Sequence, residues 1–326
     1  MKTIAVTMGD PCGIGPEIVL RAAADPEISS LCKLLVIGDR AILEKTARSL
    51  DIQGLSRHFW QNQIYHIECA EILPEEIGHI SPKGGQAAFD CIKAAVDLAE
   101  KSHIHAVATA PINKEALRAA GVPHIGHTEI FGALTGTEDP LTMFETLGLR
   151  VFFLTRHLSL RQACEKVTVP RLLEYISRCT GALKEIGISS GRMAVAGLNP
   201  HCGEHGLFGS EEEAIYQAVE QAQKLGFPVE GPIGADSVFH LVKIGRYCAV
   251  LSLYHDQGHI ATKTLDFERT IAITLGLPFL RTSVDHGTAF DIAGKGIASA
   301  VSMKEAIRLA AKYQERRFGT LASQRS

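Results

Sequence analysis

Short apolar runs rich in β-branched residues alternate along this chain with amphipathic stretches of helical period. This alternation is typical of a mostly parallel sheet covered by helices. The apolar runs predict strands at 3–7, 34–37, 106–109, 151–154, 193–196 and 248–253. The amphipathic stretches predict helices at 16–24, 85–101, 170–185, 211–224 and 303–316. We therefore predict an α/β fold.

A chain of 326 residues is long enough for one large α/β domain or for two smaller ones, each with a substantial core. It contains no internal repeat, no low-complexity segment and no obvious linker. A second domain would therefore be interleaved with the first. We expect a discontinuous first domain at 1–125 plus 280–326 and a second domain at 126–279.

The composition is that of an ordinary soluble enzyme, with 46% hydrophobic residues, 21% charged residues and a net charge of −3. It implies no strongly basic face, so nucleic acid and anionic membranes are poor candidates as partners. The eight cysteines are scattered without a Cys-x-x-Cys pair, which favours reduced thiols in a cytosolic protein. No apolar stretch reaches the roughly 20 residues needed to span a bilayer. We expect a cytoplasmic protein.

Three histidines follow strand-like runs: His157, His201 and His255. In open α/β sheets, ligands bind at the edge where the carboxyl ends of the strands lie. Three imidazoles that converge there could hold a divalent metal and leave coordination positions open for a substrate. The alternative is three unrelated polar loop residues, because the wide spacing does not by itself show that they meet.

Two further turns carry candidate chemistry. The glycine-rich turn at 9–17 could bring backbone N–H groups close to an anion, but it lacks the Gly-x-Gly-x-x-Gly fingerprint, and a tight structural turn explains it equally well. In the second turn, His127 and Thr128 could bind a phosphate or a carboxylate. The alternative there is a helix N-cap, with Thr128 as the capping residue and Glu129 in the first turn.

The segment at 254–296 is the densest in candidate functional residues. Lys263 and Arg281 are fixed positive charges that could hold a phosphate, Arg281 by a bidentate fork. The run at 285–288 offers a carboxylate, an imidazole and a flexible turn within four positions. Separate surface salt bridges explain the whole set less readily than a functional site does.

Five motifs occur in a fixed order: Gly-Asp-Pro-x-Gly-Ile-Gly-Pro-Glu at 9–17, Gly-His-Thr-Glu at 126–129, Leu-Asn-Pro-His-x-Gly-Glu at 198–204, Tyr-His-Asp-Gln-Gly at 254–258, and Gly-Leu-Pro-Phe-x-Arg-Thr-Ser-x-Asp-His-Gly-Thr-Ala at 276–289. Together they resemble the 4-hydroxythreonine-4-phosphate dehydrogenase family over essentially the whole chain. The resemblance implies a fold like that of isocitrate and isopropylmalate dehydrogenases, with two α/β domains and a cleft between them. It also implies a homodimer whose active sites are each completed by the neighbouring subunit.

The resemblance assigns metal ligands, substrate-binding residues and phosphate-binding cations by position: His157, His201 and His255; His127 and Thr128; Lys263 and Arg281. It implies NAD bound without a Rossmann fingerprint, with His286, Gly287 and Thr288 near the nucleotide. It also implies one divalent metal per site, which could be zinc, magnesium, cobalt or manganese. The expected reaction is oxidation of a 4-phosphorylated 3-hydroxy acid followed by decarboxylation, with Asp256, Asp285 and Lys263 as candidate catalytic residues.

One position departs from the biosynthetic members of this family. They have an asparagine that touches the substrate where this chain has Ala272. Alanine cannot make that polar contact, so the substrate could be 4-phospho-D-threonate or 4-phospho-D-erythronate in place of 4-phosphohydroxy-L-threonine, the substrate of pyridoxine biosynthesis. The pair His259-Ile260 also resembles this catabolic branch. A metal-dependent hydrolase of a phosphorylated compound is a more remote alternative.

Overall fold

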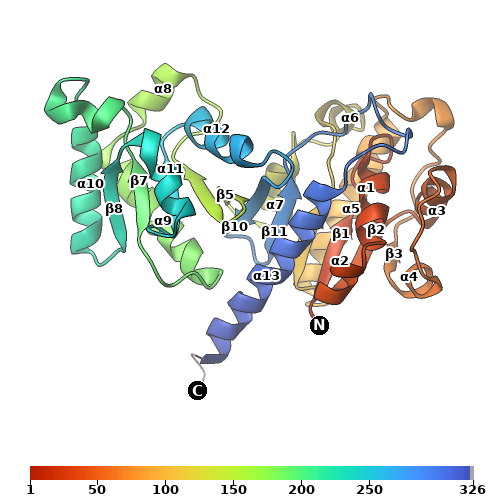
Figure 1. Ribbon diagram of the computed structural model, residues 1–326. Helices are drawn as coiled ribbons and strands as arrows, with labels where there is room; N and C mark the ends of the chain where they lie inside the picture. Colours follow the sequence, from red (N-terminus) through yellow and green to blue (C-terminus); the bar gives the residue numbers. More distant parts are fainter. Residues whose placement is uncertain (324–326) are drawn as a thin grey trace. The chain divides into compact units, whose positions relative to one another are not determined.

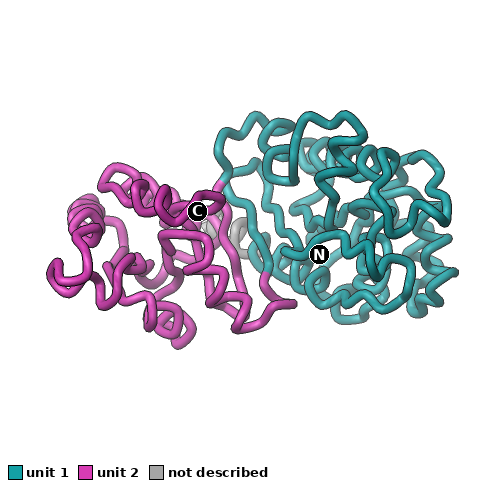
Figure 2. The backbone as a smooth tube through the Cα atoms, turned by 90° about the horizontal axis from the view of Figure 1, so that it is seen from above, with its two compact units in different colours: residues 1–140, 271–315 teal, residues 141–270, 316–326 magenta. Residues whose placement is uncertain are grey.

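The chain folds into two compact units (Figure 2). The computed structural model describes residues 1–323, with side chains to residue 314. Unit 1 consists of Met1–Pro140 and Ile271–Glu315, and unit 2 consists of Leu141–Thr270 with the C-terminal residues from Arg316. The second unit is thus interleaved with the first.

Unit 1 is an α/β unit. Its strands are β1 (Thr3–Thr7), β2 (Lys33–Gly38), β3 (Ile64–His66), β4 (Ala106–Thr109), β10 (Ile271–Leu275) and β11 (Leu280–Val284). Its helices are α1 (Gly15–Ala23), α2 (Pro26–Leu31), α3 (Arg40–Ser49), α4 (Arg57–Asn62), α5 (Pro82–Glu100), α6 (Lys114–Ala119), α7 (His127–Thr135) and the part of α13 (Val301–Ser323) that precedes Arg316, with a short 3-10 turn, η1 (Pro74–Glu76). The strand order is β3-β2-β1-β4-β11-β10, parallel except for the antiparallel pair β10–β11 (Figure 1). Helix α5 packs against β1, β2 and β4, and also contacts α6 and α7.

Unit 2 is a second α/β unit. Its strands are β5 (Leu141–Thr146), β6 (Leu149–Phe153), β7 (Met193–Ala196), β8 (Val229–Ile233) and β9 (Ala249–Ser252). Its helices are α8 (Leu160–Glu165), α9 (Val169–Glu185), α10 (Glu212–Lys224), α11 (Ala235–Lys243) and α12 (His255–Leu265), with a turn, η2 (Pro200–Gly206), after β7. The strand order is β5-β6-β9-β7-β8, parallel except for the hairpin β5–β6. Helices α11 and α12 pack on the central strands, and α10 packs on α9 and β8.

The boundaries of the units differ from the predicted ones. Residues 126–140 and 271–279 belong to unit 1, whereas the sequence prediction placed them in the second domain; the residues from Arg316 belong to unit 2, whereas the prediction placed them in the first. Helix α7 belongs there because it packs against α5, and its Phe131 ring lies 5.9 Å from the ring of Phe279. Strand β10 belongs there because it pairs with β11 from Ile271 to Thr274. These contacts join segments far apart in the sequence, so no local pattern could reveal them.

All predicted strands and helices are present, with ends that differ by a few residues. The predicted mostly parallel character of the sheet is also confirmed, because β10–β11 and β5–β6 are the antiparallel pairs among the strand pairs described above. The eight cysteines are free thiols, as expected. No helix in the described part of the chain is long and apolar enough to cross a membrane.

Candidate active site

Three loops that carry histidines leave the same edge of the sheet in unit 2. Strands β6, β9 and β7 are parallel neighbours, so their carboxyl ends lie together. His157 follows β6, His255 follows β9 and His201 follows β7. The prediction that each histidine lies just past the end of a strand is confirmed, at the edge where α/β sheets bind ligands.

His255 begins α12 and lies close to two other histidines. The ring centroids of His157 and His255 are 6.1 Å apart, and those of His255 and His259 are 4.2 Å apart. Nδ1 of His255 lies 2.6 Å from Oδ1 of Asp256. If Nδ1–H donates to this carboxylate, the lone pair of Nε2 is free for a metal ion. Asp256 therefore orients a candidate ligand.

His259 is a buried histidine for which the sequence predicted no role in the histidine site. Its ring stacks on Phe153 at 4.7 Å and meets the edge of Phe144 at 4.4 Å. Burial, followed by the charge of His255, lowers the pKa of His259 to about 4, so its imidazole is neutral at pH 7. The sequence could have indicated this residue, because His259 follows His255 by four positions, a spacing that places both rings on one face of a helix.

The start of α12 is held in place by two residues of the Tyr-His-Asp-Gln-Gly motif. The side chain of Gln257 accepts from the backbone N–H of Leu253 at 2.7 Å and donates to the carbonyl of Gly197 at 2.8 Å. It thus ties the His255 turn to the loop that leads to His201. A Cβ at Gly258 would lie 2.6 Å from the Phe153 ring, so only glycine lets α12 approach β6 this closely.

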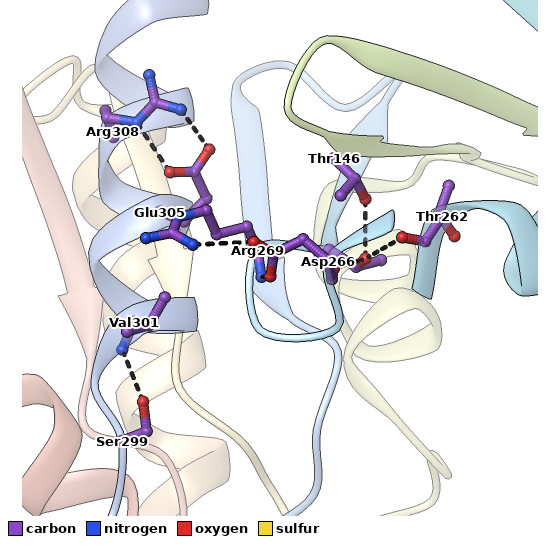
Figure 3. A network of polar contacts seen from close by, with 9 residues as sticks. Thr146, Thr262, Asp266, Arg269, Ser299, Val301, Glu305 and Arg308 are labelled. Atoms are coloured by element: carbon purple, nitrogen blue, oxygen red, sulfur yellow. Dashed lines mark hydrogen bonds and ion pairs between the residues drawn. The ribbon is translucent and has the colours of Figure 1, made fainter. Parts of the chain in front are cut away.

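The other end of α12 is fastened to β5 by a small network of hydroxyl groups (Figure 3). The Thr270 hydroxyl lies 2.8 Å from the hydroxyl of Thr146. It is also within hydrogen-bond distance of the carbonyls of Thr262, at 3.3 Å, and Asp266, at 2.7 Å. With both ends anchored, α12 presents His255 and Lys263 from a rigid element. Lys263 is half-buried, with Nζ 5.4 Å from the centroid of Phe267.

His201 lies in a left-handed turn that a buried carboxylate holds. The residues from His201 to His205 all have positive φ, with φ 51° at His201. Oε1 of Glu212 accepts from the backbone N–H groups of Leu198 and Asn199, at 2.8 and 2.5 Å, and Oε2 accepts from the Asn199 amide at 2.8 Å. Positive φ is uncommon outside glycine and costs energy. The contacts of Glu212 supply the outside support that such a turn needs.

The donor chemistry of this edge suits a divalent metal, since neutral imidazoles are common ligands of zinc, cobalt and manganese. The structure brings His157 and His255 together, while His201 stands on a separate exposed turn. Among side chains 1–314, no group of three His, Cys, Asp or Glu residues is arranged to hold a metal ion. The three-histidine site therefore stays a prediction.

In unit 1, Arg281 on β11 is buried, with 3% of its surface exposed. Its guanidinium donates from Nη1 to Thr274 and from Nη2 to Thr109, both at 2.9 Å. Nε has no hydrogen-bond partner among the described residues. Burial lowers the pKa of Arg281 to about 9, against a small opposing effect of Glu129. A buried cation held only by neutral hydroxyls is a suitable receptor for an anion.

His127 is a second polar group in the same part of unit 1. Its Nε2 is buried and has no hydrogen-bond partner within residues 1–314, and its ring stacks 6.4 Å from Phe131. Burial and the nearby charge of Arg281 hold the pKa of His127 well below its usual range. The guanidinium of Arg281 lies 5.2 Å from the same Phe131 ring. The two residues predicted to bind substrate thus share one aromatic neighbour.

The capping alternative for Thr128 is wrong. Helix α7 begins at His127, its N-cap is Gly126, and Glu129 lies in the first turn. Thr128 is therefore a half-buried residue of the first turn, next to His127. This outcome leaves its hydroxyl available for the substrate-binding role predicted for it.

Four backbone N–H groups of the glycine-rich turn are engaged within unit 1, which favours the structural alternative for this turn. The backbone N–H groups of Asp10 and Gly13 donate to the carbonyls of Pro111 and Asp10, and Cys12 donates to the Asp10 side chain. Ile14 donates to the carbonyl of Thr288 at 3.0 Å. These N–H groups are occupied, so they do not form an anion site. The turn instead fixes the predicted nucleotide-binding segment at 285–288.

That segment leaves β11 as a loop whose polar groups differ in exposure. Thr288 is buried at 5% exposure, while Gly287 is exposed. Asp285 and His286 are half-buried, and Nδ1 of His286 lies 3.0 Å from the carbonyl oxygen of Gly287. Nothing in unit 1 tests the assignment of His286, Gly287 and Thr288 to NAD, which stays a prediction.

Comparisons with known proteins point to one family. The family model of the pyridoxal phosphate biosynthetic protein PdxA matches residues 30–310. A protein of Fusobacterium nucleatum named "Putative D-threonate 4-phosphate dehydrogenase" is 59% identical, covering 96% of this chain and 98% of its own length. A Clostridium botulinum protein of the same name is 57% identical, covering 95% of this chain and 96% of its own. The crystal structure of 4-hydroxythreonine-4-phosphate dehydrogenase from Klebsiella pneumoniae is 40% identical with a TM-score of 0.84, covering 96% of this chain and all of that one.

Proposed function

This chain belongs to the PdxA family of pyridoxal phosphate biosynthetic proteins, and from that membership we propose that it is an NAD-dependent dehydrogenase of D-threonate 4-phosphate. The relatives at 57–59% identity bear this name over almost their full length. The second candidate substrate is 4-phosphohydroxy-L-threonine, since the Klebsiella enzyme at 40% identity is named for it. Both compounds are phosphorylated hydroxy acids.

The observation that carries this proposal is the buried guanidinium of Arg281. It has no carboxylate partner among the described residues, and the unpartnered Nε2 of His127 belongs to the same aromatic cluster. A buried cation of this kind is stabilised when an anion binds. A substrate with a phosphate at one end and a carboxylate at the other supplies such an anion. We assign Arg281 and Lys263 to the phosphate, and His127 and Thr128 to hydrogen bonds with the substrate.

The choice of D-threonate 4-phosphate over the amino acid rests on Ala272. Its methyl group lies on β10 opposite Ser283 of β11, in a half-buried position. Alanine offers no hydrogen bond to a substrate amine. A neutral hydroxyl loses less than a charged amine by facing a methyl group, so Ala272 is compatible with a hydroxyl where the amino acid has its amine.

His157, His201 and His255 would hold one divalent metal, which when bound supplies Lewis-acid polarisation of the oxygens at the reacting carbons. His286, Gly287 and Thr288 would contact NAD, which accepts the hydride. Because Asp256 is engaged with His255 at 2.6 Å, its role is to orient that imidazole. Since Lys263 is assigned to the phosphate, we assign proton transfer to Asp285, the third candidate catalytic residue. The isocitrate dehydrogenase-like fold and the homodimer expected from the family are part of the same proposal.

The test is NADH formation on 4-phospho-D-threonate, 4-phospho-D-erythronate and 4-phosphohydroxy-L-threonine, with and without a chelator. We expect the highest kcat/KM on 4-phospho-D-threonate and loss of activity with the chelator. A preference for the amino acid would place the chain among the biosynthetic enzymes and make Ala272 a tolerated substitution. Phosphate release without NAD would refute the dehydrogenase and favour a hydrolase.

A matched pair of histidine variants tests the metal ligands. His201 and His205 both lie exposed in the same left-handed turn, but only His201 is a proposed ligand. We expect His201→Ala to lose bound metal and turnover together, and His205→Ala to keep both. A metal-free, fully active His201→Ala variant would eliminate the proposed site.

A further inference from the structure

Arg281 is held from both sides by hydroxyl groups of the strands that flank it. In the strand order β4-β11-β10, Thr109 lies on β4 and Thr274 on β10. Thr274 is the register partner of Arg281, and Thr109 is the register partner of Ser283. Each threonine accepts one guanidinium hydrogen bond at 2.9 Å. Both threonines are almost fully buried, at 0% and 1% exposure.

The hydroxyl of Thr109 belongs to a chain of hydrogen bonds in which each hydroxyl donates away from Arg281. It accepts from Nη2 of Arg281 and can donate to Oγ of Ser283 at 2.9 Å or, over a longer distance, to the carbonyl of Thr282 at 3.4 Å. Ser283 in turn donates to the carbonyl of Val284 at 3.1 Å. Since each hydroxyl has a single proton, donation along this chain leaves a lone pair of Thr109 facing the guanidinium. Hydrogen bonds in such a chain strengthen one another.

Neutral acceptors fix the guanidinium plane without cancelling its charge. A carboxylate at either position would satisfy Arg281 and compete with any anionic ligand. No carboxylate among the described residues forms an ion pair with Arg281, and Glu129 acts on its charge without a direct contact. Nε, which has no partner within residues 1–314, is a donor that this arrangement leaves for a ligand.

We propose that Thr109, with Thr274, is a positioning residue that holds Arg281 as a receptor for the phosphate group of the substrate. This inference rests on the proposed function for the identity of the substrate, but the binding of a phosphate anion can be measured without turnover. Neither threonine lies in one of the sequence motifs described above. Their role becomes visible only from strand order and register.

The test compares Thr109→Val, which keeps the shape and removes the acceptor, with Thr109→Ser, which restores it. For the phosphorylated substrate we expect Thr109→Val to raise KM about tenfold, equivalent to about 1.4 kcal/mol, with kcat changed less than about twofold. The Kd for inorganic phosphate, measured by calorimetry on the full chain, should rise by a similar factor. Thr109→Ser should restore both values to within about threefold of wild type.

Thr7 provides a matched control. It is the register partner of Thr109 on β1, is fully buried, and its hydroxyl has no hydrogen-bond partner among the described side chains. Thr7→Val therefore removes a buried hydroxyl from the neighbouring strand without touching Arg281. It should leave KM and the phosphate Kd unchanged.

The outcomes separate the two proposals. If wild type forms no NADH but binds phosphate, and Thr109→Val weakens that binding, the proposed function fails and the positioning role stands. If Thr109→Val lowers kcat and leaves KM and the phosphate Kd unchanged, or if Thr7→Val has the same effect as Thr109→Val, the positioning role is refuted. Absence of phosphate binding by wild type would also refute it.

Discussion

Replacement of Arg281 by methionine is expected to make the protein more stable and inactive. The arginine is almost fully buried, and its direct contacts are two threonine hydroxyls and the face of Phe131, while Glu129 opposes the effect of burial without forming an ion pair. Methionine has a similar length, no charge and a flexible chain that fills an irregular space. The substitution removes the desolvation cost of the guanidinium together with its function.

The expected gain can be worked out from the structure. Burial lowers the pKa of Arg281 to about 9, and at about 1.4 kcal/mol per pH unit this disfavours the charged form by roughly 5 kcal/mol. The lost interactions offset part of the gain, with about 1 kcal/mol for each of the two hydrogen bonds and about 1 kcal/mol for the cation–π contact. We therefore expect Arg281→Met to raise the free energy of unfolding by about 2 kcal/mol.

The gain should depend on pH in a defined direction. The folded-state pKa of Arg281 is lower than the unfolded one, so its penalty is present in full below pH 9 and is relieved as the pH rises through about 9. The stability difference between variant and wild type should thus be largest near pH 7 and shrink above pH 9.

The assay is urea unfolding in phosphate-free buffer, followed by the fluorescence of Trp60, the single tryptophan, which lies in unit 1 with Arg281. Phosphate should stabilise wild type and leave the variant unchanged. The control is Arg150→Met, since Arg150 pairs with the buried carboxylate of Glu145 at 3.3 Å. Followed by circular dichroism, this control should lose about 3 kcal/mol. An Arg281→Met variant less stable than wild type without phosphate would refute the reasoning.

Three further predictions concern other parts of the fold. Gly85→Ala should destabilise the chain by about 3 kcal/mol, because its Cβ would lie 2.1 Å from the carbonyl oxygen of Ala116. Gly181→Ala on α9, where no described atom outside the surrounding helical turns lies within 4 Å of the new Cβ, should stabilise it by about 0.5–1 kcal/mol; equal effects of the two substitutions on the free energy of unfolding in urea would contradict this. Burial raises the pKa of Asp10 to about 6, which disfavours the ionised form in the folded state. Asp10→Asn should therefore be more stable than wild type by up to about 3 kcal/mol at pH 8, with an advantage that fades between pH 6 and 4; a constant difference would show that ionisation is not the cause. Glu212→Gln should weaken the contacts to the His201 turn, so hydrogen exchange at the amides of Leu198 and Asn199 should accelerate by about tenfold or more. The exposed neighbour Glu213→Gln should have no such effect.

The sequence by itself determined the secondary structure and the position of the histidine loops. Strands such as β1 and β7 were predicted to the residue, because their apolar runs depend on local periodicity. His157, His201 and His255 follow the ends of such runs, so their place at one edge required only that the strands be parallel. The family motifs added the expected chemistry, since each motif is a local string of residues.

Tertiary structure decided what depends on distant segments. Helix α7 belongs to unit 1 because it packs on α5, and the glycine turn is structural because its N–H groups meet Pro111 and Thr288. The partners of Arg281 come from 172 and 7 residues away, and only strand order brings them to one guanidinium. Local patterns encode which residues are buried in a strand or helix. The neighbours that a buried charge meets are set by packing between segments, and these neighbours decide whether it becomes a salt bridge or a receptor.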